Sequence, residues 1–209
     1  MSATMRVRVC AAGCLLLAGG AAAQELLDRV LARIGASAVT LTDVQAAVGL
    51  GLVEARPGED PSVVGLEGVI DRRLLLAEVA RFPPPAPPAA EVAEEVSAMK
   101  ARAGDRLGAL MTRTGPDERR LREMARDTLR IRAYIAQRFG TSAQVRDEDV
   151  RAYYDRHPEQ FRRRGALTPF EQAEPEVRER ASEERLRDTI DAWIADLRMR
   201  AEIVHVGAR

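Results

Sequence analysis

Apolar and polar positions near the start of the chain predict a small β-hairpin. Residues Arg29–Ile34 alternate as a strand does, a turn of small residues follows, and residues 39–41 form a second short extended piece. Thr42 and Gln45 are spaced as a capping box, in which each side chain satisfies a free backbone amide at the start of a helix. A helix is therefore expected to begin near Asp43.

Helical periodicity dominates the rest of the chain. Apolar residues recur at spacings of three and four, which indicates amphipathic helices that bury one face. Helices are expected at 62–82, from 90 to about 110, at 118–138, from 147 to His157 and at 170–201. The proline-rich residues 83–88 cannot continue a helix, because proline lacks the backbone amide and clashes with the preceding turn. They are expected to form a stiff connector, with a docking site for a proline-recognition domain as the alternative.

The chain ends in a short apolar stretch at 203–206, which is typical of a strand. The hairpin at 29–41 carries the other strand signals, so the two ends of the chain are expected to pair. The predicted fold class is mainly α, with a small β-sheet that joins the amino-terminal hairpin to the carboxy-terminal strand.

Residues 1–23 have the three-part build of a cleavable signal peptide. Positive charge from Arg6 and Arg8 precedes a short apolar stretch, and the small residues Ala21 and Ala23 stand before Gln24. Cleavage is therefore predicted between Ala23 and Gln24.

The same stretch has two alternative interpretations, a membrane-spanning anchor and a lipidated cysteine. A spanning anchor would need about 20 apolar residues, more than residues 9–19 supply. A lipidated Cys14 would leave Leu15, Leu16 and Leu17 on the mature protein, although a lipidated cysteine normally closes the apolar segment. The cleaved signal and a periplasmic location are therefore expected.

Composition narrows the chemistry of the exported chain. Both cysteines, Cys10 and Cys14, precede the predicted cleavage site, so thiol chemistry and disulfides are excluded after it. The remaining 30 basic and 32 acidic residues nearly balance, which predicts no nucleic-acid partner and no strong attraction to anionic lipid. All but one of the basic residues are arginine, a bias that we attribute to genome composition.

The sequence offers few candidates for catalysis. His157 and His205 are the two histidines, and each is expected to be a surface residue. No metalloprotease helix, serine nucleophile elbow or phosphate-binding loop is found. The acids around Glu91–Glu95 and Glu183–Glu184 are expected to be solvated ion pairs, Arg162–Arg164 a solvated loop, and at most one of Tyr153 and Tyr154 to face a ligand. We therefore expect no catalytic, cofactor-binding or metal-binding residues and no enzymatic activity.

The order of the predicted elements resembles the chaperone module of the SurA family, periplasmic proteins related to parvulin-type peptidyl-prolyl isomerases, with a fold similar to that of trigger factor. The resemblance rests on segments in a fixed order: 30–44, 69–78, 150–161, 169–173 and 193–203. After the predicted signal peptide at 1–23, it implies a single chaperone module at 24–209, made of 24–161 and a closing helix and strand at 167–209.

The chain departs from that family at one position. Relatives with a parvulin domain carry it between the Tyr-Tyr segment and the closing helix, where this chain has only residues 162–166. The resemblance then implies ATP-independent binding of unfolded or partly folded envelope and outer-membrane polypeptides, without isomerase activity. A non-catalytic adaptor that binds one folded partner and an enzyme of unrecognised type remain alternatives.

Overall fold

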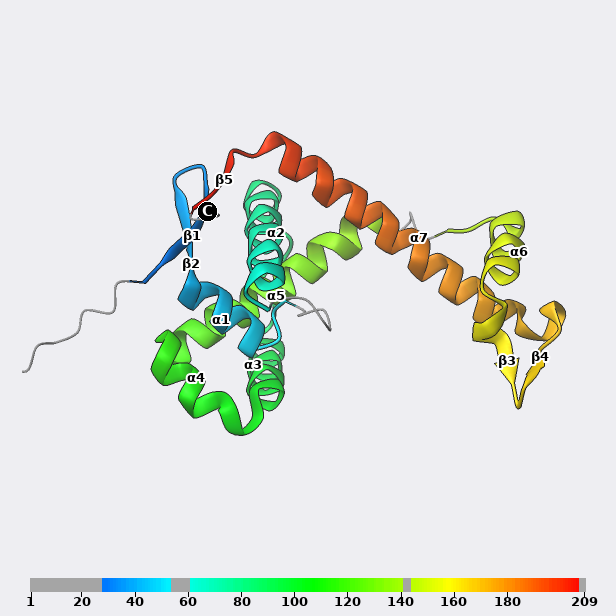
Figure 1. Ribbon diagram of the computed structural model, residues 1–209, viewed down its shortest axis with the longest axis horizontal. Coiled ribbons are helices and arrows are strands. Elements are labelled where there is room, and N and C mark those ends of the chain that lie inside the picture. Colours follow the sequence, from blue (N-terminus) through cyan, green and yellow to red (C-terminus); the bar gives the residue numbers. More distant parts are fainter. Residues whose placement is uncertain (1–27, 54–60, 141–143, 207–209) are drawn as a thin grey trace, which may run out of the picture.

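The computed structural model describes residues 28–53, 61–140 and 144–206 (Figure 1). The predicted signal peptide and its cleavage residues Ala21, Ala23 and Gln24 lie outside the described residues. The described chain is mainly helical with a small antiparallel sheet, as the sequence predicts. Its helices are α1 (Leu41–Gly49), α2 (Pro61–Arg81), α3 (Ala89–Ala103), α4 (Leu107–Thr114), α5 (Glu118–Phe139), α6 (Asp147–Arg156) and α7 (Phe170–Arg200).

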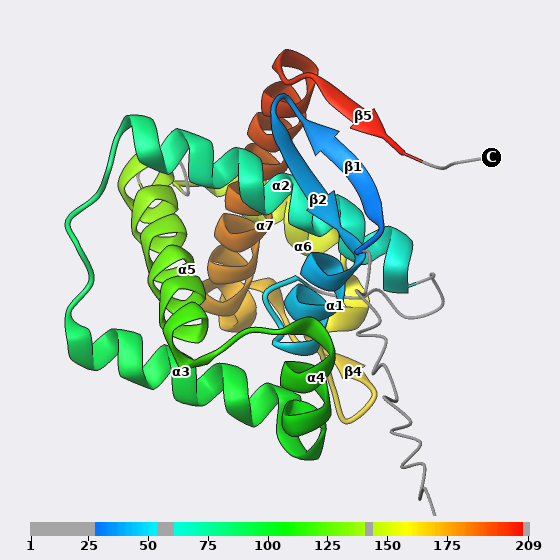
Figure 2. The same cartoon turned by 90° about the vertical axis from the view of Figure 1, so that its left-hand side faces the viewer.

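The sheet joins the two ends of the described chain. Its strands are β1 (Val30–Ile34), β2 (Ser37–Thr40) and β5 (Ile203–His205), in the order β2-β1-β5 and all antiparallel (Figure 2). Ala32 lies opposite His205, and the Val206 amide donates to the Leu31 carbonyl at 2.8 Å. The predicted pairing of the hairpin with the final strand is confirmed.

The capping box of α1 differs from the predicted one. Thr40, the last residue of β2, is the N-cap: its hydroxyl accepts from the Asp43 amide at 3.3 Å, and the Asp43 carboxylate accepts from the Thr40 amide at 3.2 Å. Thr42 lies instead in the first turn and bonds to Asp28. The predicted Thr42 and Gln45 pair was wrong because the strand passes into the helix without a linker, so the cap falls two residues earlier.

The largest apolar cluster joins the sheet to α1, α2, the end of α5 and the second half of α7. Trp193 of α7 is 8% exposed and packs between two rings of α5, Tyr134 with a centroid distance of 5.8 Å and Phe139 at 5.2 Å. The closing helix therefore shares a core with the amino-terminal elements.

A second cluster lies beneath α3, α4 and the first half of α5. The periodicity predicted one helix from 90 to about 110, but Gly104 has a φ of 53° and the chain turns there through a short 3-10 helix. Such a φ is unfavourable for other residues and open to glycine. The predicted helix is therefore two helices, α3 and α4, and α4 folds back onto α1.

A third cluster lies at the other end of α7, against α6 (Figure 1). Between these helices the short strands β3 (Arg162–Arg163) and β4 (Ala166–Leu167) form a hairpin with a two-residue turn. Both turn residues have positive φ, 50° at Arg164 and 85° at Gly165, as a turn that follows the twist of its strands requires. Residues 162–166, expected to be a loop, form this tight hairpin.

Candidate functional site

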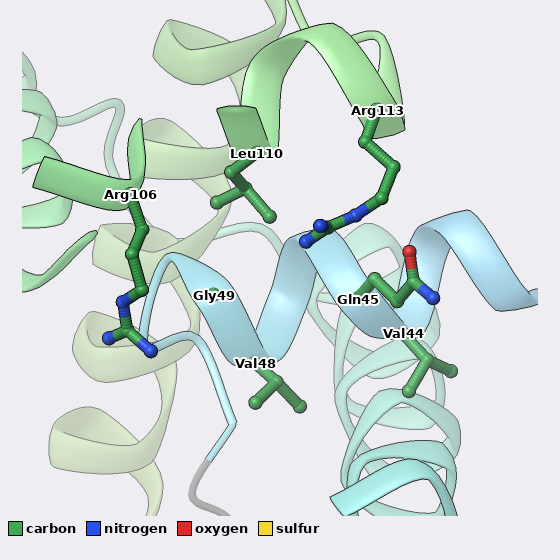
Figure 3. A pocket seen from close by; sticks show the side chains of 7 residues that line it. All are labelled: Val44, Gln45, Val48, Gly49, Arg106, Leu110 and Arg113. Atoms are coloured by element: carbon green, nitrogen blue, oxygen red, sulfur yellow. The ribbon is translucent and has the colours of Figure 1, made fainter. Parts of the chain in front are cut away.

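The candidate site is a pocket between α1 and α4. Its volume is about 220 Å³, and the side chains that line it come from these helices and the turn before α4 (Figure 3). The lining residues are Val44, Gln45, Val48, Gly49, Arg106, Leu110 and Arg113. This combination of an apolar floor and a few polar groups is typical of small ligand-binding pockets.

Helix α1 supplies one wall of the pocket, through one core residue and two residues that the core covers only in part. Val44 is buried against the sheet and α2, whereas Gln45 and Val48 are only half-buried. Gly49 lets the second wall approach closely, because a Cβ at this position would lie 2.7 Å from the Leu110 side chain. The absence of a side chain at Gly49 therefore sets the spacing of the two helices.

Helix α4 and the 3-10 turn before it supply the opposite wall. Leu110 and Arg113 are three residues apart on α4 and project on the same side, and Arg106 ends the turn that leads into the helix. Leu110 is 4% exposed and points between the helices, while both arginines are exposed at the rim (Figure 3). The helix ends where Gly115 takes the left-handed conformation, with a φ of 78°. The pocket therefore has an apolar floor and a cationic rim.

The buried carboxylate of Glu95 connects the helices that surround α4. Glu95 of α3 is 7% exposed and accepts from Arg102 at 2.9 Å and from Arg132 of α5 at 2.7 Å. Arg102 also donates to the Leu50 carbonyl at the end of α1, at 3.1 Å. Burial alone would raise the pKa of Glu95, but the hydrogen bonds and charges of the two arginines outweigh it and hold the pKa below its usual value. This pairing ties α3 to α5 and to the end of α1.

A second charge cluster holds the closing segment on α2. Arg198 of α7 pairs with Glu67 at 2.6 Å and also with Asp71, and the His205 ring of β5 lies 2.9 Å from the Glu67 carboxylate. Partial burial of Glu67 raises its pKa, whereas the hydrogen bonds from Arg198 and His205 lower it by more, so the net shift is downward. The cluster therefore favours the ionised carboxylate.

The residues that the sequence analysis considered as candidates for function lie outside the pocket, in several parts of the fold. His205 is exposed and bonded to Glu67, and His157 is half-buried with its ring 4.5 Å from that of Tyr153. Tyr153 and Tyr154 are both buried in the third cluster, and Tyr153 also lines a surface hollow between α6 and α7. Arg162–Arg164 lie on the exposed hairpin.

Glu95 corrects one of these expectations. The acids of α3 were expected to be solvated, and Glu91 and Glu94 are exposed, but Glu95 is buried between two arginines. The local sequence does not indicate that Glu95 is buried, because one of its two arginine partners, Arg132, comes from α5. Within residues 28–53, 61–140 and 144–206, no three His, Cys, Asp or Glu side chains are grouped to hold a metal ion. The expectation of no metal, cofactor or catalytic residue stays a prediction.

Sequence reasoning missed the pocket residues themselves. The spacing of Arg106, Leu110 and Arg113 was a usable signal, but Gly104 and Gly108 obscured the helix that carries them. No helix among the described residues combines the length and apolarity needed to cross a membrane.

Comparisons with known proteins assign no family. No protein-family model matches the chain, and no curated protein matches it.

Proposed function

We propose that this chain is a periplasmic, ATP-independent, chaperone-like protein that binds unfolded envelope polypeptides, outer-membrane proteins among them, in the pocket between α1 and α4. The observation that carries the proposal is the pocket, which is open to solvent and lined by Val44, Val48 and Leu110. An exposed apolar recess of this kind is a site for a partner's side chain.

The size of the pocket favours a side chain over a larger ligand. Its volume of about 220 Å³ is below the range of about 300–1,000 Å³ that drug-sized ligands occupy. It exceeds the cavity of about 150 Å³ that holds a benzene molecule. One leucine-sized or aromatic side chain of an extended segment therefore fits, which favours weak and broad binding.

Two further features support a SurA-like module without isomerase activity. The closing helix α7 returns the final strand to the amino-terminal hairpin, which is the arrangement that the resemblance implies. At the position where relatives carry a parvulin domain, β3 and β4 meet in a two-residue turn. The predicted signal peptide supports the periplasmic location.

Suppression of aggregation tests this proposal. A urea-unfolded β-barrel protein is diluted into buffer without ATP, and light scattering is followed with and without the mature chain. We expect the chain to reduce scattering when it is in excess over the client. A Gln45→Trp variant should lose most of this effect, because the indole would occupy the pocket.

The matched control is Gln137→Trp, which places the same residue on the exposed surface of α5 outside the pocket. It should behave as the unmodified chain, and circular dichroism should give the same helix content for both variants. If the unmodified chain leaves aggregation unchanged, the chaperone proposal fails and an adaptor for one folded partner becomes the better hypothesis. If both tryptophan variants stay fully active, the pocket is not the binding site.

A further inference from the structure

We propose that the α1–α4 pocket selects polypeptide segments in which a large apolar side chain is flanked by carboxylates. This inference rests on the proposed function and defines its substrate class. It is carried by the charged side chains that line the pocket, which among the described residues are both arginines.

The rim presents two arginines that are available to a ligand. Arg106 and Arg113 line the pocket and are exposed, and neither forms an ion pair with another described residue. Other arginines on neighbouring helices are already paired: Arg73 of α2 lies 2.6 Å from Asp43, and Arg102 of α3 lies 2.9 Å from Glu95. The two rim guanidinium groups therefore form the cationic part of the pocket.

Among the described residues, no carboxylate in the lining opposes them. None of the described lining residues is acidic, and Asp105, which precedes Arg106, is not among them. The nearest acid of α1, Asp43, is held by Arg73 and by the capping box. A ligand carboxylate would meet a site of complementary charge, whereas a ligand lysine would meet like charge.

The geometry fits an extended segment with acids on both sides of the apolar residue. Arg106, in the turn before α4, and Arg113, on α4, are seven residues apart, which separates their Cα atoms by roughly 10 Å at helical rise. In an extended chain, side chains on one face recur at every second residue. Acids two positions before and two positions after the apolar residue therefore share its face and lie about 13 Å apart, a span that two long arginine side chains can cover. Leu110 lies between the arginines, above the apolar floor, and the half-buried Gln45 amide beside Arg113 can bond to a peptide group of the ligand (Figure 3).

Fluorescence anisotropy with matched labelled peptides tests the inference. The peptides share one central leucine and differ only in the residues two positions before and two positions after it, which are both glutamate, both glutamine or both lysine. We expect the glutamate peptide to bind about tenfold more tightly than the lysine peptide at low salt, with the glutamine peptide between them. The difference should shrink as ionic strength rises, because exposed charges are screened.

Two double variants that remove the same charge distinguish an effect of the rim arginines from an effect of the protein's net charge. The double variant Arg106→Gln/Arg113→Gln should bind the three peptides with nearly equal affinity. The control Arg33→Gln/Arg187→Gln removes the same charge from exposed positions outside the pocket and should keep the preference. Equal loss in both double variants would overturn the inference, because net charge would then explain the preference.

The remaining outcomes distinguish this inference from the proposed function. If the unmodified chain binds all three peptides equally and still suppresses aggregation, the proposed function stands and the acidic preference is wrong. If it binds none of them and suppresses no aggregation, the proposed function itself fails. Sedimentation velocity tests whether a second copy of the chain occupies the pocket. A dimer that dissociates in the Arg106→Gln/Arg113→Gln variant would assign the pocket to that second copy and overturn the inference.

Discussion

Replacing Trp193 by alanine should destabilise the largest apolar cluster, which joins the sheet, α1, α2 and α5, although the residue belongs to α7. Trp193 is 8% exposed and contacts Tyr134 and Phe139 of α5, and the Arg138 guanidinium lies 5.1 Å from its ring. Removal of a buried tryptophan side chain costs about 3–5 kcal/mol, and loss of the cation–π contact adds up to ~1 kcal/mol. We expect the free energy of unfolding to fall by about 4 kcal/mol, a large part of the roughly 5–15 kcal/mol that stabilises a typical domain.

Urea denaturation followed by far-UV circular dichroism measures this change. Thermal melting should show a fall in Tm of about 8–16 °C, since 1 kcal/mol shifts a chain of this length by roughly 2–4 °C. The control is Met199→Ala on the same helix, where the side chain is 79% exposed and the change should stay within about 0.5 kcal/mol.

The unmodified protein offers a further check. Trp193 is the single tryptophan of the chain, so its fluorescence reports the contact of α7 with α5. The fluorescence and circular dichroism transitions of the unmodified protein should coincide if α7 shares the core of the body. A loss below about 1 kcal/mol in Trp193→Ala, or a fluorescence change that precedes the loss of helix, would refute a shared core.

Three further predictions follow from the charged clusters and from the hairpin. The pKa of Glu67 is lower in the folded protein than its usual 4.5, so its ion pairs stabilise the protein above that pH and are lost as pH falls further through the folded-state value. Glu67→Gln should therefore flatten the fall of Tm below about pH 4.5, and an unchanged slope in acid titrations would contradict this. Glu95→Ala should lower the free energy of unfolding by about 1–3 kcal/mol, because Arg102 and Arg132 would lose a shared buried partner. The exposed Glu94→Ala should change it by less than about 0.5 kcal/mol in the same urea titration, and equal effects would count against the buried pairing. A protease-coupled assay on a proline peptide should stay at the uncatalysed rate of tens to hundreds of seconds, and any clear acceleration by the purified chain would reverse the prediction of no isomerase activity.

Long periodic patterns made most of the fold predictable. The helix expected at 62–82 spans Pro61–Arg81, and the one expected at 118–138 spans Glu118–Phe139, because each buries a continuous stripe over several turns. The pairing of β5 with β1 could also be inferred, since few other segments had strand character. These are properties that local sequence carries strongly.

The details that failed depend on contacts between distant segments. The cap of α1 lies at Thr40 because β2 passes into the helix without a linker, and the helix expected after Ala89 ends at Gly104, where the chain turns so that α4 packs on α1. Gln45 and Arg113 are far apart in sequence and meet only through that turn. A pocket that forms between helices leaves little trace in the periodicity of either one.

The sheet also sets the order in which the molecule can be completed during synthesis. Ala32 of β1 is made early, and His205, its partner on β5, is made 173 residues later. Contacts of such long sequence separation are slow to form, because the intervening chain must lose conformational freedom before they contribute. Until β5 arrives, β1 keeps an unpaired edge and the apolar face of α2 lacks its cover from α7. Chains truncated before residue 200 should therefore remain open to proteases, and protection should begin only once β5 is present.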